Sequence, residues 1–198
     1  MSEVLRGRQA LTVDPVQEMA GRPGTPAQLP RPGDVGGAAR LRRIAISGHR
    51  GLPAATAGLV DAAIRAALAG GGAGVTALSC LADGADQIFA RAVLDLGGKI
   101  EAVVAAEKYR DGLPAQAHAE YDRLLGQAVA VHQLPFTECT SEAHMAASTF
   151  MIGQAGELWA VWDGQPARGR GGTADVVAYA RGCGKPVLVI WPDGAHRD

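Results

Sequence analysis

The sequence predicts an α/β fold: a doubly wound, mostly parallel Rossmann-like sheet with helices on both faces, in a single domain. Short apolar runs alternate with longer segments whose apolar residues recur at helical spacing. Glycine-rich stretches separate the two kinds of segment, and this order repeats from residue 41 to residue 192. Such an alternation is typical of parallel strands joined by crossover helices.

Length and composition fit one domain with flanking tails. The chain has 198 residues, of which 47% are hydrophobic, enough for a substantial core. Residues 41–192 form the predicted domain, and residues 193–198 are expected to be a short carboxyl-terminal tail. We expect residues 1–40 to be a disordered or loosely docked tail, because they lack periodicity and contain Pro15, Pro23, Pro26, Pro30 and Pro32.

Charge, hydropathy and cysteine content argue against several classes of function. A formal net charge of −1 gives no overall basic field, which argues against a nucleic-acid partner. No apolar run approaches the roughly 20 residues of a membrane helix, and the amino terminus lacks a secretory pattern, so we expect a cytoplasmic protein without a membrane partner. The three cysteines show no CxxC spacing, and we expect no metal site and no cofactor.

The first half of the domain contains two units of strand, loop and helix. The first predicted strand, residues 42–47, ends in Gly48-His49-Arg50-Gly51 and precedes an amphipathic helix. The second strand, residues 75–80, leads through the turn at residues 81–86 into a helix with a buried stripe from Ile88 to Leu96.

The second half repeats the pattern. Helices are expected after Pro114, from Ser141 with Met145, Thr149 and Ile152 along it, and from Gly171-Gly172-Thr173. The remaining strands are predicted at residues 100–105, 129–134, 158–162 and 187–190.

The stretch from Leu158 to Ile190 is the most informative unit, because its glycine loop follows a strand and opens a helix. The first N–H groups of a helix are unpaired and favour an anion, and glycines let a phosphate approach the backbone. Gly171, Gly172 and Thr173 are therefore candidates for a phosphate cradle. An ordinary turn with Thr173 as a helix cap is the alternative, since the stretch matches neither GxGxxG nor a Walker loop.

Polar residues at other strand ends are also candidates. His49 and Arg50 are either a solvated loop pair or a cationic contact to a phosphate. Asp83 and Asp86 are either helix caps or contacts to a ribose hydroxyl or a metal-bound water. Tyr109, next to Arg110, either stacks on a base or packs on the surface. In a parallel sheet these strand ends share one edge and can converge on one ligand.

Four motifs together resemble the SLOG superfamily of Rossmann-like nucleotide-binding proteins, over about residues 42–192. That group includes the LOG cytokinin-activating phosphoribohydrolases, the DNA-processing SMF proteins and ligand-sensing domains of TRPM channels. The motifs are Ile46-Ser47-Gly48-His49-Arg50, Leu81-Ala82-Asp83-Gly84-Ala85-Asp86, Trp162-Asp163-Gly164 and Gly171-Gly172-Thr173-Ala174-Asp175.

The resemblance implies a pocket for a nucleotide or nucleotide-derived ligand, such as a nucleoside phosphate, NAD or ADP-ribose. It places phosphate on the glycine turn and the ribose or base against the other strand ends. It also implies a homodimer or larger homo-oligomer. The expected ligand-binding residues are Gly48, His49, Arg50, Leu81, Ala82, Asp83, Gly84, Asp86, Tyr109, Asp163, Gly164, Gly171, Gly172 and Thr173.

One departure from the family's pattern decides between two functions. LOG enzymes carry PGGxGTxxE, and the glutamate that helps cleave the N-glycosidic bond corresponds here to Val176. Asp175 lies one residue earlier, about 100° around a helix from that direction. We therefore expect a non-catalytic binding module, used for ligand sensing or as a carrier. The alternative is a LOG-like N-glycoside hydrolase of nucleoside monophosphates, with Asp175 or Asp163 stabilising the ribosyl cation.

Overall fold

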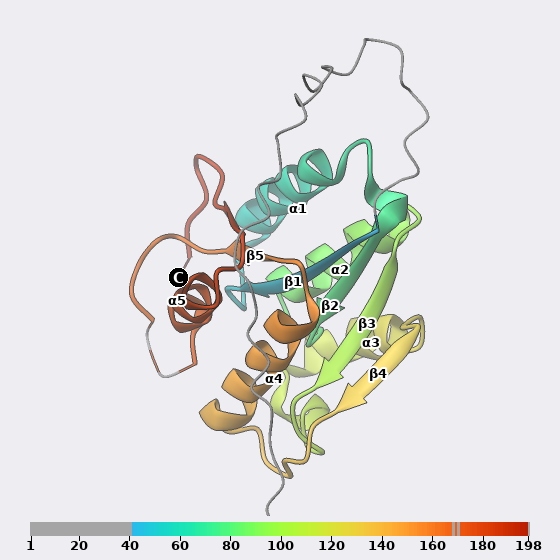
Figure 1. The fold of residues 1–198 in the computed structure, drawn as a ribbon, viewed down its shortest axis with the longest axis vertical. Coiled ribbons are helices and arrows are strands. Elements are labelled where there is room, and N and C mark those ends of the chain that lie inside the picture. Colours follow the sequence, from blue (N-terminus) through green and yellow to red (C-terminus); the bar gives the residue numbers. More distant parts are fainter. Residues whose placement is uncertain (1–40, 168, 170, 198) are drawn as a thin grey trace, which may run out of the picture. The chain divides into compact units, whose positions relative to one another are not determined.

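The computed structural model describes residues 41–167, 169 and 171–197 (Figure 1). The tail predicted at residues 1–40 lies outside the described residues. Six strands form one sheet in the order β4-β3-β2-β1-β5-β6, and all five pairings are parallel. The predicted α/β fold with a parallel, doubly wound sheet is confirmed. The strands are β1 (Arg42–Gly48), β2 (Val75–Ser79), β3 (Lys99–Val104), β4 (Ala130–Gln133), β5 (Glu157–Val161) and β6 (Val187–Ile190).

Five helices cover the two faces of the sheet. The crossovers from β1 through β4 all run toward the same edge, and a right-handed connection then puts α1, α2 and α3 on one face. The chain returns to the other side of β1 for β5, so α4 and α5 cover the opposite face, with α4 in front of the sheet in Figure 1. The helices are α1 (Ala54–Leu68), α2 (Ala85–Asp95), α3 (Ala115–Leu125), α4 (Ser141–Gln154) and α5 (Thr173–Gly182).

The core lies on both faces of the central strands. Ile44 and Ile46 of β1 are fully buried, and Trp159 of β5 packs its ring 5.4 Å from that of Phe89 on α2. Because β1 is covered on both faces, its middle reads as a continuous apolar run, as the strands of parallel sheets do. No helix in the part of the chain that the structure describes is long and apolar enough to cross a membrane.

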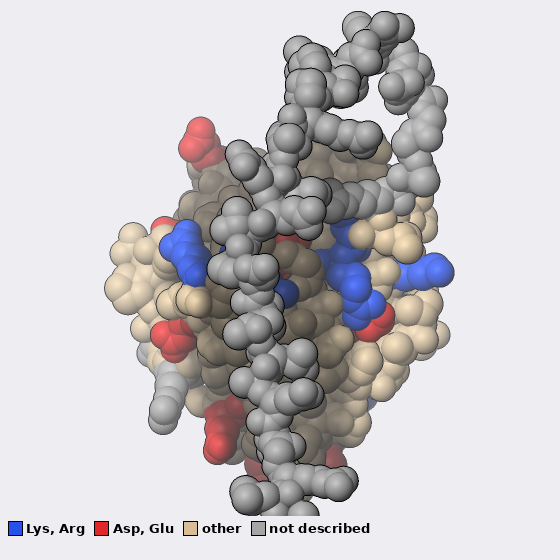
Figure 2. Space-filling view, viewed as in Figure 1, with Lys and Arg blue, Asp and Glu red and all other residues tan. Residues whose placement is uncertain are grey.

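Charged side chains are scattered over the surface and are largely paired. Among the described residues visible in Figure 2, Lys and Arg form small separate groups with Asp and Glu nearby. Arg110 forms a two-pronged pair with Asp122, and Arg123 binds Glu120 in the same way. Exposed pairs of this kind add little stability, but they neutralise the basic groups that a polyanion would need.

Candidate functional site

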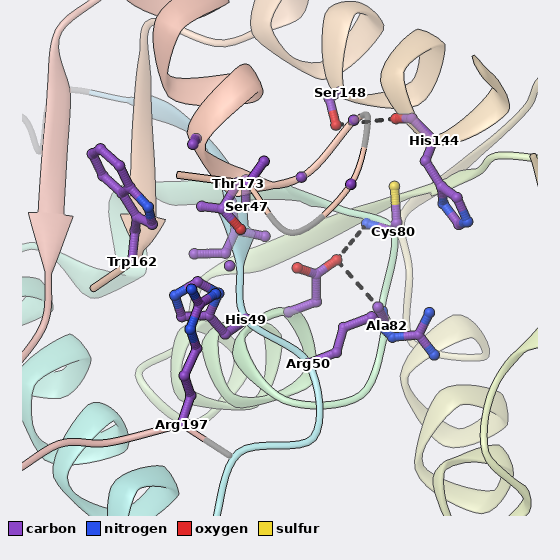
Figure 3. A pocket seen from close by; sticks show the side chains of 18 of the residues that line it. Ser47, His49, Arg50, Cys80, Ala82, His144, Ser148, Trp162, Thr173 and Arg197 are labelled. Atoms are coloured by element: carbon purple, nitrogen blue, oxygen red, sulfur yellow. Dashed lines mark hydrogen bonds between the residues drawn. The ribbon is translucent and has the colours of Figure 1, made fainter. Parts of the chain in front are cut away.

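A cavity of about 370 Å³ opens at the carboxyl ends of β1 and β2, beneath the first turn of α5 (Figure 3). This is the edge at which open α/β sheets bind ligands, and the volume lies in the range of small-molecule sites. The β1–α1 loop, the β2–α2 turn, the β5–α5 loop and α4 each contribute to its wall. The strand ends that the sequence suggested would converge therefore do meet.

The α5 wall presents hydrogen-bond donors. Gly171 has φ +81°, in the left-handed region, and the N-cap Gly172 carries no side chain that could cap the helix. Among the described residues, no acceptor binds the N–H groups of Thr173 and Ala174, and both residues line the cavity. The Thr173 side chain is 9% exposed, and its hydroxyl has no hydrogen-bond partner in the described part of the chain. Thr173 is thus the first helical residue rather than the cap.

The β2–α2 wall contributes one open carboxylate oxygen. Oδ2 of Asp86 accepts hydrogen bonds from the Ser79 hydroxyl at 3.2 Å and from the N–H groups of Cys80 and Ala82 at 3.1 and 3.4 Å. Figure 3 draws the two backbone bonds as dashed lines. No described residue hydrogen-bonds Oδ1, and Asp86 lines the cavity with 7% of its surface exposed. Desolvation raises the pKa of Asp86 to about 6, although the three hydrogen bonds and Arg50 oppose the shift.

A strained residue holds this turn in place. Leu81 has φ 59°, which is costly for a residue with a branched side chain. Its N–H donates to the Ser79 hydroxyl, and its carbonyl accepts from the Gln87 amide. The buried Leu81 side chain and these two hydrogen bonds hold the backbone in this strained conformation. In it, the N–H groups of Cys80 and Ala82 point toward Asp86. Leu81 therefore shapes the site from below and does not line the cavity.

Arg50 reaches the cavity as half of an ion pair. Its Nε donates to Oδ1 of Asp83 at 2.7 Å, and Oδ2 of Asp83 accepts from the N–H of Gly51. Asp83 is thus occupied in holding the β1–α1 loop, and it does not line the cavity. The Arg50 side chain is 42% exposed, so the pair leaves guanidinium N–H groups for a further partner.

A second charged cluster joins β1, β5 and the end of the chain. Nε2 of His49 lies 3.1 Å from Oδ1 of Asp163, and Nε of Arg197 lies 2.7 Å from Oδ2. Nη1 of Arg197 is 3.4 Å from Nδ1 of His49, and the backbone N–H of Asp163 is 3.2 Å from Nε2. An Nε2–H tautomer donates to the Asp163 carboxylate, whereas an Nδ1–H tautomer accepts from the Asp163 N–H. Burial alone would raise the pKa of Asp163, but the N–H of Gln165 together with His49 and Arg197 lowers it below the usual range.

The carboxyl-terminal residues pack back on the domain. The Thr56 hydroxyl is fully buried, donates to the carbonyl of His196 at 2.8 Å and accepts from its N–H at 3.0 Å. This anchor places Arg197 in the cavity wall beside His49, as Figure 3 shows. Within the predicted tail at residues 193–198, His196 therefore contacts the start of α1 and Arg197 contacts His49 and Asp163.

Helix α4 closes the cavity opposite the strand ends. His144 and Ser148 lie one helical turn apart and both line it (Figure 3). Burial, followed by the charge of Arg50, lowers the pKa of His144, so its ring is neutral near pH 7. Tyr109 also lines the cavity, but it is only 2% exposed and packs its ring against those of Tyr121 and His144. It is a buried wall residue, and its neighbour Arg110 pairs with Asp122 outside the cavity.

The predicted site residues fall into two groups. Those that line the cavity are Gly48, His49, Arg50, Ala82, Asp86, Tyr109, Gly171, Gly172 and Thr173. Those that lie outside the cavity lining are Leu81, Asp83, Gly84, Asp163 and Gly164. Asp175 does not line the cavity either: its Oδ2 accepts from the N–H of Gly171, and it faces a second hollow between α4 and α5.

Several cavity residues escaped the sequence analysis. Arg197 could not be found, because its position depends on the anchor at Thr56. His144 and Ser148 were missed because the sequence analysis followed Met145, Thr149 and Ile152 along this helix. The helix buries Ile152 together with Ala143, Ala147 and Met151. Small alanines gave too weak a signal to fix which face of this helix is inside. Trp162 belonged to a quoted motif, and its indole N–H donates to the carbonyl of Gln165 beside the cavity.

Comparison with known proteins shows similarity at the level of the fold. The sequence matches no protein-family model, and no curated protein gives a significant match. DNA processing protein A from Streptococcus pneumoniae is 19% identical with a TM-score of 0.57, over 78% of this chain and 52% of that one. The two proteins share a Rossmann-like α/β fold. This chain spans about half the length of that structure.

A second structure with a similar fold is DNA processing protein A from Helicobacter pylori, which binds single-stranded DNA. It is 15% identical with a TM-score of 0.54, over 79% of this chain and 68% of that one. At such identities the likeness extends to the fold and not to the ligand. The homo-oligomer implied by the resemblance stays a prediction.

Proposed function

We propose that the protein binds a phosphorylated nucleotide-type ligand in the cavity at the carboxyl ends of β1 and β2, as a binding module. The observation that carries this proposal is the α5 wall. Two N–H groups and the hydroxyl of Thr173, a residue that is 9% exposed, have no partner among the described residues, and Thr173 and Ala174 both line the cavity. Buried polar groups are normally hydrogen-bonded, so this wall is suited to a ligand that brings several acceptors.

The charges around the cavity support an anionic ligand. The guanidinium groups of Arg50 and Arg197 both line it, and each is steadied by a carboxylate that stays outside, Asp83 and Asp163 respectively. Such pairs hold the donors in fixed orientations before the ligand arrives, which lowers the entropy cost of binding. A phosphate oxygen can then replace water on the remaining N–H groups.

The hydrolase alternative has weak support. Both carboxylates proposed from the sequence are engaged elsewhere, Asp163 by His49 and Arg197, and Asp175 by the N–H of Gly171. Neither lines the cavity, so neither is placed to stabilise a ribosyl cation formed there. We therefore infer that the ligand is retained rather than cleaved.

The test uses the hydroxyl that faces the cavity. Thr173→Val keeps the shape of the side chain and removes only the hydroxyl, so we expect adenosine 5′-monophosphate or ADP-ribose to bind about tenfold more weakly, as for loss of a hydrogen bond to a charged group. Adenosine, without phosphate, should bind both forms equally. Thr149→Val on α4, outside the cavity, is the matched control. Affinities would be measured by isothermal titration calorimetry.

Three results would contradict the proposal. If Thr173→Val weakened the binding of nucleotide and of adenosine equally, the phosphate would not bind at the α5 turn. Time-dependent release of free adenine, followed by chromatography in the same samples, would show hydrolysis. Tight binding of an oligodeoxynucleotide that falls steeply with added salt would favour the ligand of the Helicobacter pylori protein, although the paired surface arginines argue against it.

A further inference from the structure

Asp86 is the one cavity-lining residue with a carboxylate in the part of the chain that the structure describes. Its two oxygens have different environments. Oδ2 is held by Ser79, Cys80 and Ala82, whereas Oδ1 meets no donor from the described residues. The carboxylate cannot turn without breaking three hydrogen bonds, so Oδ1 is a fixed acceptor at the cavity wall.

Asp86 and the α5 turn present opposite chemistry to the same cavity. The N–H groups of Thr173 and Ala174 need acceptors, which a phosphate supplies. Oδ1 of Asp86 needs a donor and would repel a second phosphate. A ligand that satisfies both walls is anionic at one end and carries a hydroxyl or amino group at the other.

We propose that Asp86 is the specificity-determining residue of the cavity, and that its free Oδ1 accepts a hydrogen bond from a ribose hydroxyl, so that ribonucleotides bind better than deoxyribonucleotides. This inference rests on the proposed function. A sugar hydroxyl fits better than an amino group of the base, because the sugar is covalently next to the phosphate held by α5.

The preference depends on the ionisation of Asp86. Of the titratable groups around it, Cys80 and Tyr109 stay neutral because burial raises the pKa of each well above its usual value, and the pKa of His144 is lowered. Arg50 is the positive group that favours the carboxylate. Above about pH 6 the ionised Oδ1 accepts a strong, charge-assisted bond, and below it the protonated group offers a weaker neutral one.

The experiment compares adenosine 5′-monophosphate with its 2′-deoxy and 3′-deoxy forms by calorimetry, with wild-type protein and with Asp86→Asn. The asparagine oxygen can keep the bonds to Ser79, Cys80 and Ala82 while its amide faces the cavity as a permanent donor. For wild type at about pH 8 we expect at least one deoxy form to bind about tenfold more weakly, a preference that shrinks several-fold at about pH 5. Asp86→Asn should show the small preference at both pH values.

Asp95→Asn is the matched control, because it removes a carboxylate from the same helix at an exposed position outside the cavity. It should behave as wild type. If Asp86→Asn keeps the full preference and its pH dependence, the inference fails while phosphate-dependent binding through Thr173 still stands. If wild type binds the three nucleotides equally, the inference fails as well. If none of them binds, both it and the proposed function fail.

Discussion

The two walls of the cavity are built in opposite ways. In the β2–α2 wall, backbone and side chains interlock: Gly84 lies against the carbonyl of His49, and the N–H of Ala85 donates to that carbonyl at 3.2 Å. In the α5 wall the chain leaves donors open, and Gly172 has no capping side chain. The comparison teaches that one wall is held by its own hydrogen bonds, whereas the other leaves donors that no described residue satisfies.

The largest expected effect is on the interlocked wall. Gly84 has φ +87°, and a Cβ there would lie 2.5 Å from the carbonyl oxygen of His49, a backbone atom that cannot move aside cheaply. Backbone strain and overpacking together predict that Gly84→Ala lowers the free energy of unfolding by about 3 kcal/mol or more. Chemical denaturation measures this directly.

Gly58 provides the control for that substitution. It lies in α1 with open space around a Cβ, so Gly58→Ala should raise the free energy of unfolding by about 0.5–1 kcal/mol. A loss of less than about 1 kcal/mol in Gly84→Ala would mean that the first wall is as loosely packed as the second.

The pH dependence of stability tests how Asp86 is buried in the β2–α2 wall. Its pKa is raised from 3.8 to about 6, so between these values the folded protein binds more protons than the unfolded chain. The contribution of Asp86 to the free energy of unfolding therefore falls as pH rises from about 4 to about 6, by about 3 kcal/mol. Asp86→Asn has no such contribution. The free energy of unfolding would be measured against pH for wild type and for Asp86→Asn, and the difference between the two curves gives the contribution of Asp86. A difference that does not change with pH would mean that the Asp86 carboxylate is solvated and its pKa is not raised.

A smaller effect is expected in the α5 wall. Gly171 has φ +81°, and a Cβ would lie 3.0 Å from the carbonyl of Ser141, so Gly171→Ala should cost about 1–2 kcal/mol of stability. Gly164→Ala is matched in φ, +78°, but meets nothing within 4 Å. Both variants carry the backbone strain, and we expect only Gly171→Ala to weaken nucleotide binding as well. If calorimetry gave the same nucleotide affinity for Gly171→Ala and Gly164→Ala, the α5 turn would not contact the ligand.

The sequence predicted three aspartates as ligand-binding residues, but only one of them lines the cavity. Asp83, Asp86 and Asp163 all follow strands, and local spacing gave no reason to prefer one. Their partners decide: Arg50 and Gly51 occupy Asp83, and His49 and Arg197 occupy Asp163. Of these three aspartates, only Asp86 has a carboxylate oxygen to which no described residue donates a hydrogen bond. The predicted roles of the aspartates could not be separated without these contacts.

By itself the sequence determined the order of strands and helices, the parallel sheet and the edge at which the loops meet. These follow from hydrophobic periodicity and from glycines, which act over a few residues. The tertiary structure alone decided which carboxylate faces the cavity, that Asp175 faces away, and that Arg197 returns to the site. The reason is that these outcomes depend on contacts between residues far apart in the chain, 33 positions for Arg50 and Asp83 and 148 for Arg197 and His49.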